Sequence, residues 1–394
     1  MRPMLMTLLA LLIAVTAGGL EIRVQPGDAL YLYDNAGEGA PSDLHTAVIQ
    51  NIALVNDLEQ AVSIERVRLE VVKAGEVVQI QIIGRDELAR AAKTFHAYQE
   101  HGVLAAYDFQ FQTSRYLTDV TFPAGIRLDT AEAVVLQRQA LLLSGLPDSV
   151  SIIADGLRDD GTRVTSEASL RVVDHHSPNE YVFPVRGRWL VAAAPSLHSH
   201  HRWVTIQEFA LDLVQIGDEG LSHRGDGSRL DMFHAYGDPV VAIGDGVVVA
   251  AVGSLPESDH NLQQPDESAE SYAERSAADQ LELLARGFVD VLGNHVVVEH
   301  PHGEFSHYFH LKPGSVTVSA GDRVVRGQVI GALGHSGNST EPHLHFHLAD
   351  GPDPACSRSL PVEFVNLTLW PADDGTVRHL HSGQVVSAAE AGCR

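Results

Sequence analysis

The chain contains a run of alternating histidines that could bind a metal or move protons. His343, His345 and His347 alternate with apolar residues, and successive side chains of a β-strand point to opposite faces. A strand here would place all three imidazoles on one face. The preceding stretch 337–340 (GNST) has turn-forming residues, and Pro342 suits the first position of a strand. Because neutral imidazole is a good zinc ligand, the pattern predicts a metal or catalytic site rather than a solvated polar face.

Further motifs precede this strand in a fixed order. Asp212 ends the stretch Phe-Ala-Leu-Asp, and His310 stands in Tyr-Phe-His-Leu. Together with the pair His343 and His345, these motifs resemble those of the lysostaphin-like zinc metallopeptidases (the M23 or LytM type), which cleave peptidoglycan cross-links. The resemblance covers residues 195–370. It implies a LytM-like antiparallel β-sheet peptidase domain.

The resemblance also implies roles for individual residues. Asp212 and His345 would bind Zn²⁺, while His310 and His343 would act as catalytic histidines beside the zinc-bound water. A catalytic zinc usually has three protein ligands and a water. The third ligand is where the chain departs from the family, because the expected His four residues before the aspartate is Glu208.

Three alternatives could supply the third zinc ligand. The cluster 198–201 (HSHH) lies just upstream, so His201 or His200 could reach the metal. Glu208 could itself bind through oxygen, which zinc accepts. His223 could enter from the following loop. We predict that His201 completes a metal site with Asp212 and His345.

The other histidines in this half are assigned by position. His307 lies three residues before His310, and this odd spacing in a strand predicts that it points to the opposite face, at the surface. His347 shares the face of His345 and is expected to orient that ligand. Four further histidines fall in turns or at strand ends and are expected on the surface: His295, His300, His302 and His335.

Three functions are compatible with these motifs. The first is a zinc metalloendopeptidase acting on peptidoglycan or another extracellular peptide. The second is a non-catalytic LytM-type regulator of cell-wall hydrolases, which Glu208 favours and the retained His and Asp positions oppose. The third is a carbohydrate- or peptide-binding module.

The length and charge of the chain limit the number of domains and the classes of partner that we expect. A chain of 394 residues is long enough for about two domains. Asp and Glu outnumber Lys and Arg by 51 to 27, which gives a net charge of −24 at pH 7. This acidity argues against nucleic acid as a partner, since phosphate binding needs a basic surface.

Residues 1–18 have the features of a secretory signal peptide. Arg2 precedes an apolar run from Leu5 to Val15 that is too short to span a bilayer comfortably. We expect a secreted or periplasmic protein with no stable membrane span after removal of the signal, and an uncleaved anchor is the alternative. Export would also permit a disulfide between Cys356 and Cys393.

Residues 20–188 are expected to form an immunoglobulin-like β-sandwich with one helical insertion. Helical spacing of apolar residues predicts the helix over 86–101, with Asp86 as the N-cap. The segments expected to form strands are 47–55, 63–72, 77–83, 120–122, 133–143, 149–155 and 166–173. The chain is therefore predicted to be all-β, with a sandwich followed by the peptidase sheet.

Two smaller segments complete the expected organisation. Residues 254–286 are polar, strongly acidic and then helical, which predicts a surface insertion within the second domain. It could form a roof over one end of a substrate groove or have no function. Residues 371–394 are expected to be a C-terminal tail.

Overall fold

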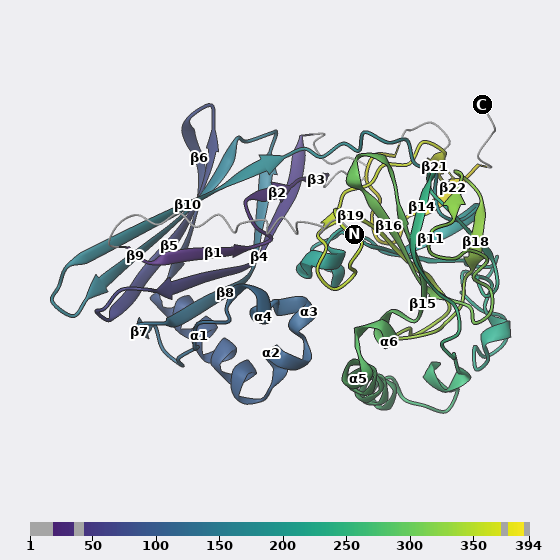
Figure 1. The fold of residues 1–394 in the computed structure, drawn as a ribbon, viewed down its shortest axis with the longest axis horizontal. Coiled ribbons are helices and arrows are strands. Elements are labelled where there is room, and N and C mark those ends of the chain that lie inside the picture. Colours follow the sequence, from purple (N-terminus) through teal and green to yellow (C-terminus); the bar gives the residue numbers. More distant parts are fainter. Residues whose placement is uncertain (1–18, 35–42, 372–376, 390–394) are drawn as a thin grey trace, which may run out of the picture. The chain divides into compact units, whose positions relative to one another are not determined.

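The computed structural model describes residues 19–34, 43–371 and 377–389. The chain divides into two compact units, Met1–Asp174 and His175–Arg394 (Figure 1). The expected signal peptide and Cys393 lie outside the described residues, so the signal and the disulfide stay predictions. None of the helices in the described ranges is long and apolar enough to cross a bilayer.

The first unit is built from two sheets. One has the order β1 (Glu21–Gln25), β4 (Leu44–Asn56) and β3 (Tyr33–Asp34), with β8 (Glu132–Ser144) also paired to β4. The other has the order β2 (Ala29–Tyr31), β10 (Arg163–Val173), β9 (Ser149–Arg158), β5 (Val62–Lys73) and β6 (Glu76–Gly84), with β7 (Arg127–Leu128) paired to β5. Their apolar side chains form a shared hydrophobic core. The immunoglobulin-like connection of the strands stays a prediction.

Strand β5 shows how the sequence pattern builds this core. Ile64, Val67 and Leu69 are fully buried, although the first two are three residues apart. The pairing of β5 with β9 shifts register between Ile64 and Arg66. Such an irregularity adds a residue to one strand and lets the alternation restart on the same face.

The predicted helical insertion is present. Helix α1 (Arg85–Glu100) is followed by the short helices α2 (Val103–Ala106), α3 (Asp108–Phe111) and α4 (Thr113–Tyr116). Phe95 of α1 packs with the β4 residues Ala53 and Val55 in a second cluster. This explains why β4 is buried on both faces. The expected N-cap at Asp86 is wrong: Gly84 is the N-cap, and Asp86 lies in the first turn, where a carboxylate favours the helix dipole.

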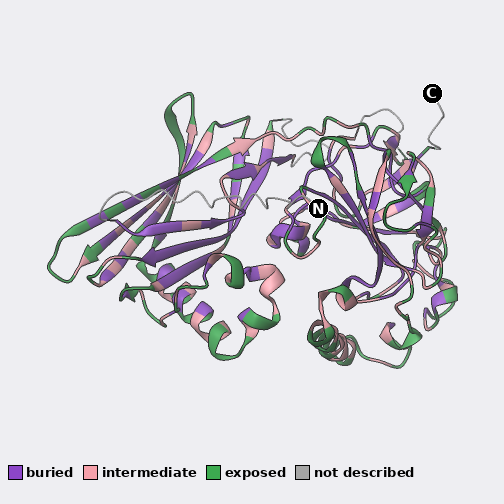
Figure 2. Cartoon of the chain, in the orientation of Figure 1, coloured by how far each residue is buried: buried purple, intermediate pink, exposed green. Residues whose placement is uncertain are grey.

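The second unit is dominated by one antiparallel sheet. Its order is β17 (Arg323–Val324), β14 (Gly246–Val252), β15 (Asn294–Glu299), β16 (Phe305–Leu311), β19 (Leu344–Ala349), β12 (Leu211–Val214), β11 (Gly187–Ala193), β22 (Val385–Ala388) and β21 (Leu367–Leu369). Strand β20 (Ser359–Leu360) pairs with β19, and β13 (Pro239–Val241) pairs with β18 (Val329–Ala332). The central strands β15, β16 and β19 are buried almost throughout (Figure 2).

The segment that enters the second unit is held by one carboxylate. Glu304 is buried and accepts hydrogen bonds from Ser177 Oγ at 2.6 Å, Asn179 Nδ2 at 2.7 Å and the Tyr181 hydroxyl at 2.7 Å. Burial alone would raise the pKa of Glu304, but the hydrogen bonds from these residues and His175 outweigh it and lower the pKa to about 2. The ionised carboxylate thus fixes the 177–181 segment to the strand β16 region.

The acidic segment within the second unit forms a helix as expected. Helix α5 (Ala269–Arg286) starts after Ser268, whose side chain accepts a hydrogen bond from the Ser271 amide, and the short helix α6 (Phe288–Leu292) follows. None of the described α5 residues is fully buried. The helix therefore lies on the surface, and it sits between β14 and β15 in the chain.

Candidate metal centre

Three neighbouring strands bring the predicted site residues to one face of the sheet. Asp212 of β12 lies directly opposite His345 of β19 in the register, and Phe309 of β16 lies opposite His345 on the other side. Directly paired residues share a face of the sheet. Alternation along the chain places His343 on the face of His345. The sheet therefore fixes the direction of each side chain.

Asp212 is the centre of this arrangement. Its Oδ1 lies 3.0 Å from Nδ1 of His345, and its Oδ2 lies 2.8 Å from Nε2 of His201. His343 Nε2 lies 3.7 Å from the same Oδ1. The rings of His201 and His345 are 4.9 Å apart between centroids. Two oxygens of one carboxylate thus face three imidazoles.

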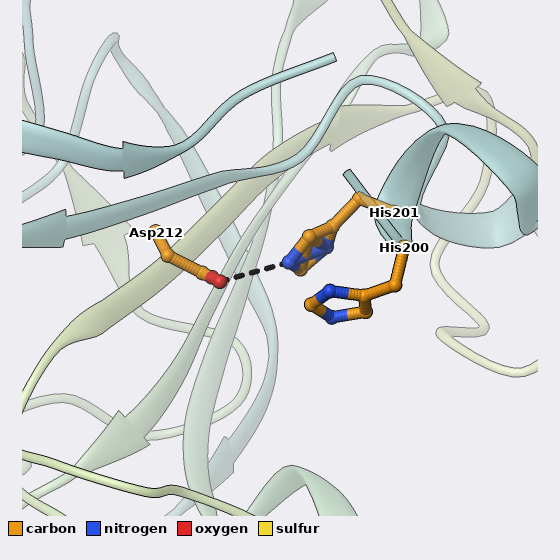
Figure 3. A group of neighbouring side chains, drawn as sticks. All are labelled: His200, His201 and Asp212. Atoms are coloured by element: carbon orange, nitrogen blue, oxygen red, sulfur yellow. Dashed lines mark hydrogen bonds and ion pairs between the residues drawn. The ribbon is translucent and has the colours of Figure 1, made fainter. Parts of the chain in front are cut away.

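The segment before β12 supplies His200 and His201. Ligand atoms of His200, His201 and Asp212 all lie within 4.8 Å of one another (Figure 3). His201 is buried and His200 is exposed. The structure thus brings together the three predicted ligands, His201, Asp212 and His345, and adds His200 at the edge of the group.

The other two alternatives for the third ligand lie elsewhere. Glu208 is buried and its carboxylate forms an ion pair of 2.9 Å with Arg202, which is itself fully buried. His223 contacts the ring of Phe233 at 5.4 Å and belongs to the loop before β13. Among the described residues, the group of possible ligand atoms consists of His200, His201 and Asp212. Glu208 and His223 are outside it, and His345 joins it through its contact with Asp212. The ion pair instead holds the short turn His201–Trp203 in place.

His310 reaches the site because the backbone leaves the strand pattern at this residue. Its φ of 62° lies in the left-handed region, which costs about 1–3 kcal/mol for a residue other than glycine. The ring lies 4.8 Å from that of His343 between centroids. Nδ1 of His310 donates to the Ser336 carbonyl at 2.8 Å. The other nitrogen, Nε2, is therefore the unprotonated one.

His343 is held in the same way. Its Nδ1 donates to the Glu341 carbonyl at 2.8 Å, which leaves Nε2 unprotonated and turned toward Asp212. Ser339 Oγ lies 3.2 Å from this Nδ1 and 2.9 Å from Nδ1 of His335. His335 is fully buried. Two histidines thus present a free Nε2 to the same space.

Burial sets the charges of the site. It lowers the pKa of His201 to about 3, and burial with His343 and His345 nearby holds the pKa of His310 well below its usual value. Burial alone would raise the pKa of Asp212, but His201, His343 and the hydrogen bond from His345 outweigh it and hold that pKa well below its usual range. The site therefore combines the neutral imidazoles of His201 and His310 with the ionised carboxylate of Asp212 at pH 7.

This donor set fits a zinc ion. Zinc accepts imidazole nitrogen and carboxylate oxygen, and imidazole must be neutral to bind it. Nδ1 of His201 is buried and makes no hydrogen bond, so this nitrogen is still able to form one bond. Nε2 of His345 lies 3.3 Å from Nδ1 of His347. Nδ1 of His345 faces Asp212 and Nε2 faces His347, so Nδ1 is the nitrogen of this ring that would face a metal bound beside Asp212.

Several histidines expected on the surface are buried instead. The expectation for His307 is wrong: it is 0% exposed, pairs in register with His347 and stacks on its ring at 4.6 Å. The spacing argument fails because the left-handed backbone at His310 turns that ring back to the face shared by His307. The expectation of a surface position is right for His302, which is exposed. It is wrong for three other histidines, which are buried: His295, His300 and His335.

Sequence reasoning missed the residues that orient the two candidate catalytic histidines, His310 and His343. Ser336 supplies the carbonyl for His310, and its hydroxyl donates to the Leu311 carbonyl at 2.7 Å. Gly337 next to it has a φ of 79°, and a Cβ there would lie 2.5 Å from the Gly293 amide. The run of small residues at 336–340 was the available signal, since such residues permit a close backbone approach.

Comparisons with known proteins cover part of this site. Residues 275–355 match the model of peptidase family M23, and this segment contains His310, His343 and His345. Two peptidoglycan DD-endopeptidases of Vibrio cholerae are similar over short segments: ShyA is 43% identical over 56 residues and ShyC is 43% identical over 54 residues. Each segment covers 14% of this chain, and only 13% of ShyA and 12% of ShyC.

Solved structures are also similar to part of the chain. The catalytic domain of lysostaphin from Staphylococcus simulans is 19% identical, covers 44% of this chain and 88% of its own, and has a TM-score of 0.25. A putative peptidase M23 from Pseudomonas aeruginosa is 16% identical, covers 56% of this chain and 77% of its own, and has a TM-score of 0.26. The segment 275–355 is thus a distant match to peptidase family M23.

Proposed function

We propose that this protein is a zinc metalloendopeptidase that cleaves peptide cross-links of peptidoglycan. The observation that supports this best is the clustering of His201, Asp212 and His345 beside two histidines with oriented rings. The short segments shared with two peptidoglycan DD-endopeptidases support the substrate class. The net charge of −24 is in keeping with a peptide rather than a nucleic acid as the partner.

In this proposal His201, Asp212 and His345 hold Zn²⁺. The ion would lower the pKa of a bound water toward about 7 and polarise the peptide carbonyl. His310 and His343 present unprotonated Nε2 atoms. One of them accepts a proton from the attacking water, and the other, when protonated, gives a proton to the leaving amine. The carbonyls that hold both Nδ1 protons keep the rings from turning.

The substrate class also requires export, because peptidoglycan lies outside the cytoplasm. The signal peptide expected in residues 1–18 would provide it. We therefore propose a secreted or periplasmic location, which a fractionation experiment with an antibody to the C-terminal unit would test. Retention in the cytoplasm would contradict it.

The direct test is cleavage of purified muropeptides by the full chain, followed by mass spectrometry. Cleavage that stops with a chelator and returns with zinc supports the proposal, and its loss in the His343→Ala variant assigns the site. The zinc content of both proteins is measured in parallel. A wild-type protein that holds no zinc under metal-replete conditions would contradict the proposal.

The alternative is a non-catalytic regulator of cell-wall hydrolases. The observation that favours it is Glu208 at the position where the family has its first metal histidine. The muropeptide assay separates the two functions, because a regulator would leave muropeptides intact with zinc present and would instead increase the activity of an added hydrolase.

A further inference from the structure

An open pocket of about 410 Å³ lies beside the segment that leads into the histidine strand β19. Its lining residues come from three separate stretches of the second unit: the loop 222–233, the insertion residues 262–272, and Thr340 with Glu341. We call it the insertion pocket. Its volume is within the range of about 300–1,000 Å³ that is typical of ligand sites.

The insertion pocket is joined to the candidate catalytic residue His343 by hydrogen bonds. The Tyr272 hydroxyl donates to the Thr340 carbonyl at 3.2 Å, and Ser222 Oγ donates to the Glu341 carboxylate at 2.5 Å. The carbonyl of Glu341 in turn accepts from Nδ1 of His343. A group bound in the pocket would therefore contact the residues that orient His343.

The charge of the insertion pocket is negative. Asp226 and Glu341 contribute carboxylates, and none of the residues that line the pocket is Lys or Arg. Arg275 lies 5.3 Å from the centre of the Tyr272 ring, but its guanidinium is paired with Glu267 at 2.8 Å. The pocket thus offers two acidic groups to an incoming ligand without a competing free cation on its lining.

The other lining residues suit an apolar stem that ends in a cation. Phe233 and Leu262 are buried in a small hydrophobic cluster at the pocket wall. Tyr272 adds an aromatic ring, and aromatic rings also attract cations. An ammonium group carries three donors and could pair with either carboxylate of the pocket.

We propose that the insertion pocket binds the side chain of a basic residue in the peptide substrate, one with an amine on an apolar stem, and so selects the peptides that reach His343. This inference rests on the proposed peptidase function. It assigns the 254–286 insertion a role in substrate choice, because Leu262 and Tyr272 form one wall of the pocket.

The test is binding of two blocked tripeptides to the full chain, measured by titration calorimetry. One peptide is Ala-Lys-Ala, with lysine of either configuration, and the other carries norleucine in place of lysine. We expect at least one lysine peptide to bind about tenfold more tightly than its norleucine counterpart. The preference should weaken with salt and should be the same with zinc or with chelator, because none of the predicted metal ligands lines the pocket.

Matched variants show which residues produce the preference for the lysine peptide. Asp226→Asn and Glu341→Gln remove one charge each and keep an oxygen for the hydrogen bonds from Ser228 and Ser222. Each should remove most of the lysine preference. Glu270→Gln removes the same charge from an exposed position of helix α5 outside the pocket, and should keep the preference.

Equal affinities for the lysine and norleucine peptides, or no binding of either, would overturn the pocket assignment. So would a loss of preference in the Glu270→Gln variant equal to that in the two pocket variants. These outcomes are separate from failure of the proposed peptidase function, which appears as missing zinc or missing chelator-sensitive cleavage of muropeptides.

Discussion

The buried ion pair between Arg202 and Glu208 leads to a sharp prediction about the metal centre. Both side chains are at most 1% exposed and lie 2.9 Å apart, and Arg358 lies 4.0 Å from the same carboxylate. The pair fixes the turn that starts at His201. Glu208→Gln would remove the negative charge that lies 2.9 Å from the buried Arg202 guanidinium.

The expected magnitude follows from the burial. Removing one partner of a buried ion pair costs about 3–5 kcal/mol, because the remaining charge stays out of water. For a unit of this size, about 2–4 °C is lost per kcal/mol, so we expect the melting temperature to fall by about 6–20 °C. The double variant Arg202→Met with Glu208→Leu replaces both charges by apolar groups and should recover much of this loss.

The assay is thermal and urea unfolding of the full chain, with zinc content measured in the same samples at low temperature. Zinc should remain bound to the Glu208→Gln variant while it is folded. A variant that loses zinc without losing stability would refute this reasoning and would make Glu208 a metal ligand. A loss of stability below about 1 kcal/mol, the range of exposed ion pairs, would also refute it.

Three further predictions concern the site and its support. Zinc content should fall in His201→Ala and change little in His200→Ala, because only the former ring is buried against the aspartate; equal losses would contradict this. His343→Ala should keep its zinc and lose about 10²–10⁴-fold in muropeptide cleavage, the usual contribution of an acid–base group; a loss of zinc would instead indicate a ligand. The pKa of Glu304 is lowered to about 2 by hydrogen bonds from the 177–181 segment that outweigh its burial. Its stabilisation is therefore fully present above its ordinary pKa and disappears as the pH falls toward 2. Glu304→Gln should flatten the stability profile in that acidic range, and an unchanged profile would contradict the assigned role.

Strands can be predicted from the sequence where the spacing of apolar residues follows the burial of their side chains. The run 47–55 lies within β4 and the segment 63–72 within β5. The expected strand 120–122 is reduced to a single bridge between Thr121 and Glu132, because two or three residues carry too little pattern to specify a partner. Register shifts such as that in β5 are also invisible in the sequence, since alternation does not tell which partner residue is opposite.

At the candidate site, the sequence indicates which residues come together, but it does not indicate how the neighbouring side chains are arranged around them. Asp212 and His345 were expected to meet and lie in direct register. His307 was assigned to the wrong side because the spacing rule assumes an extended backbone up to His310, where φ is 62°. The insertion pocket could not be foreseen, because its three walls are far apart in the chain and meet only through the fold.

The left-handed backbone at His310 makes the histidine unfavourable for stability, whereas its imidazole is useful for the proposed chemistry. Glycine would adopt this conformation without steric cost, so selection for thermal tolerance alone would favour losing the imidazole. A histidine at this position therefore carries a cost in stability that glycine would not. In a library screened only for heat resistance, we therefore expect His310 to be replaced early. A screen that also requires the proposed peptidase activity should retain it.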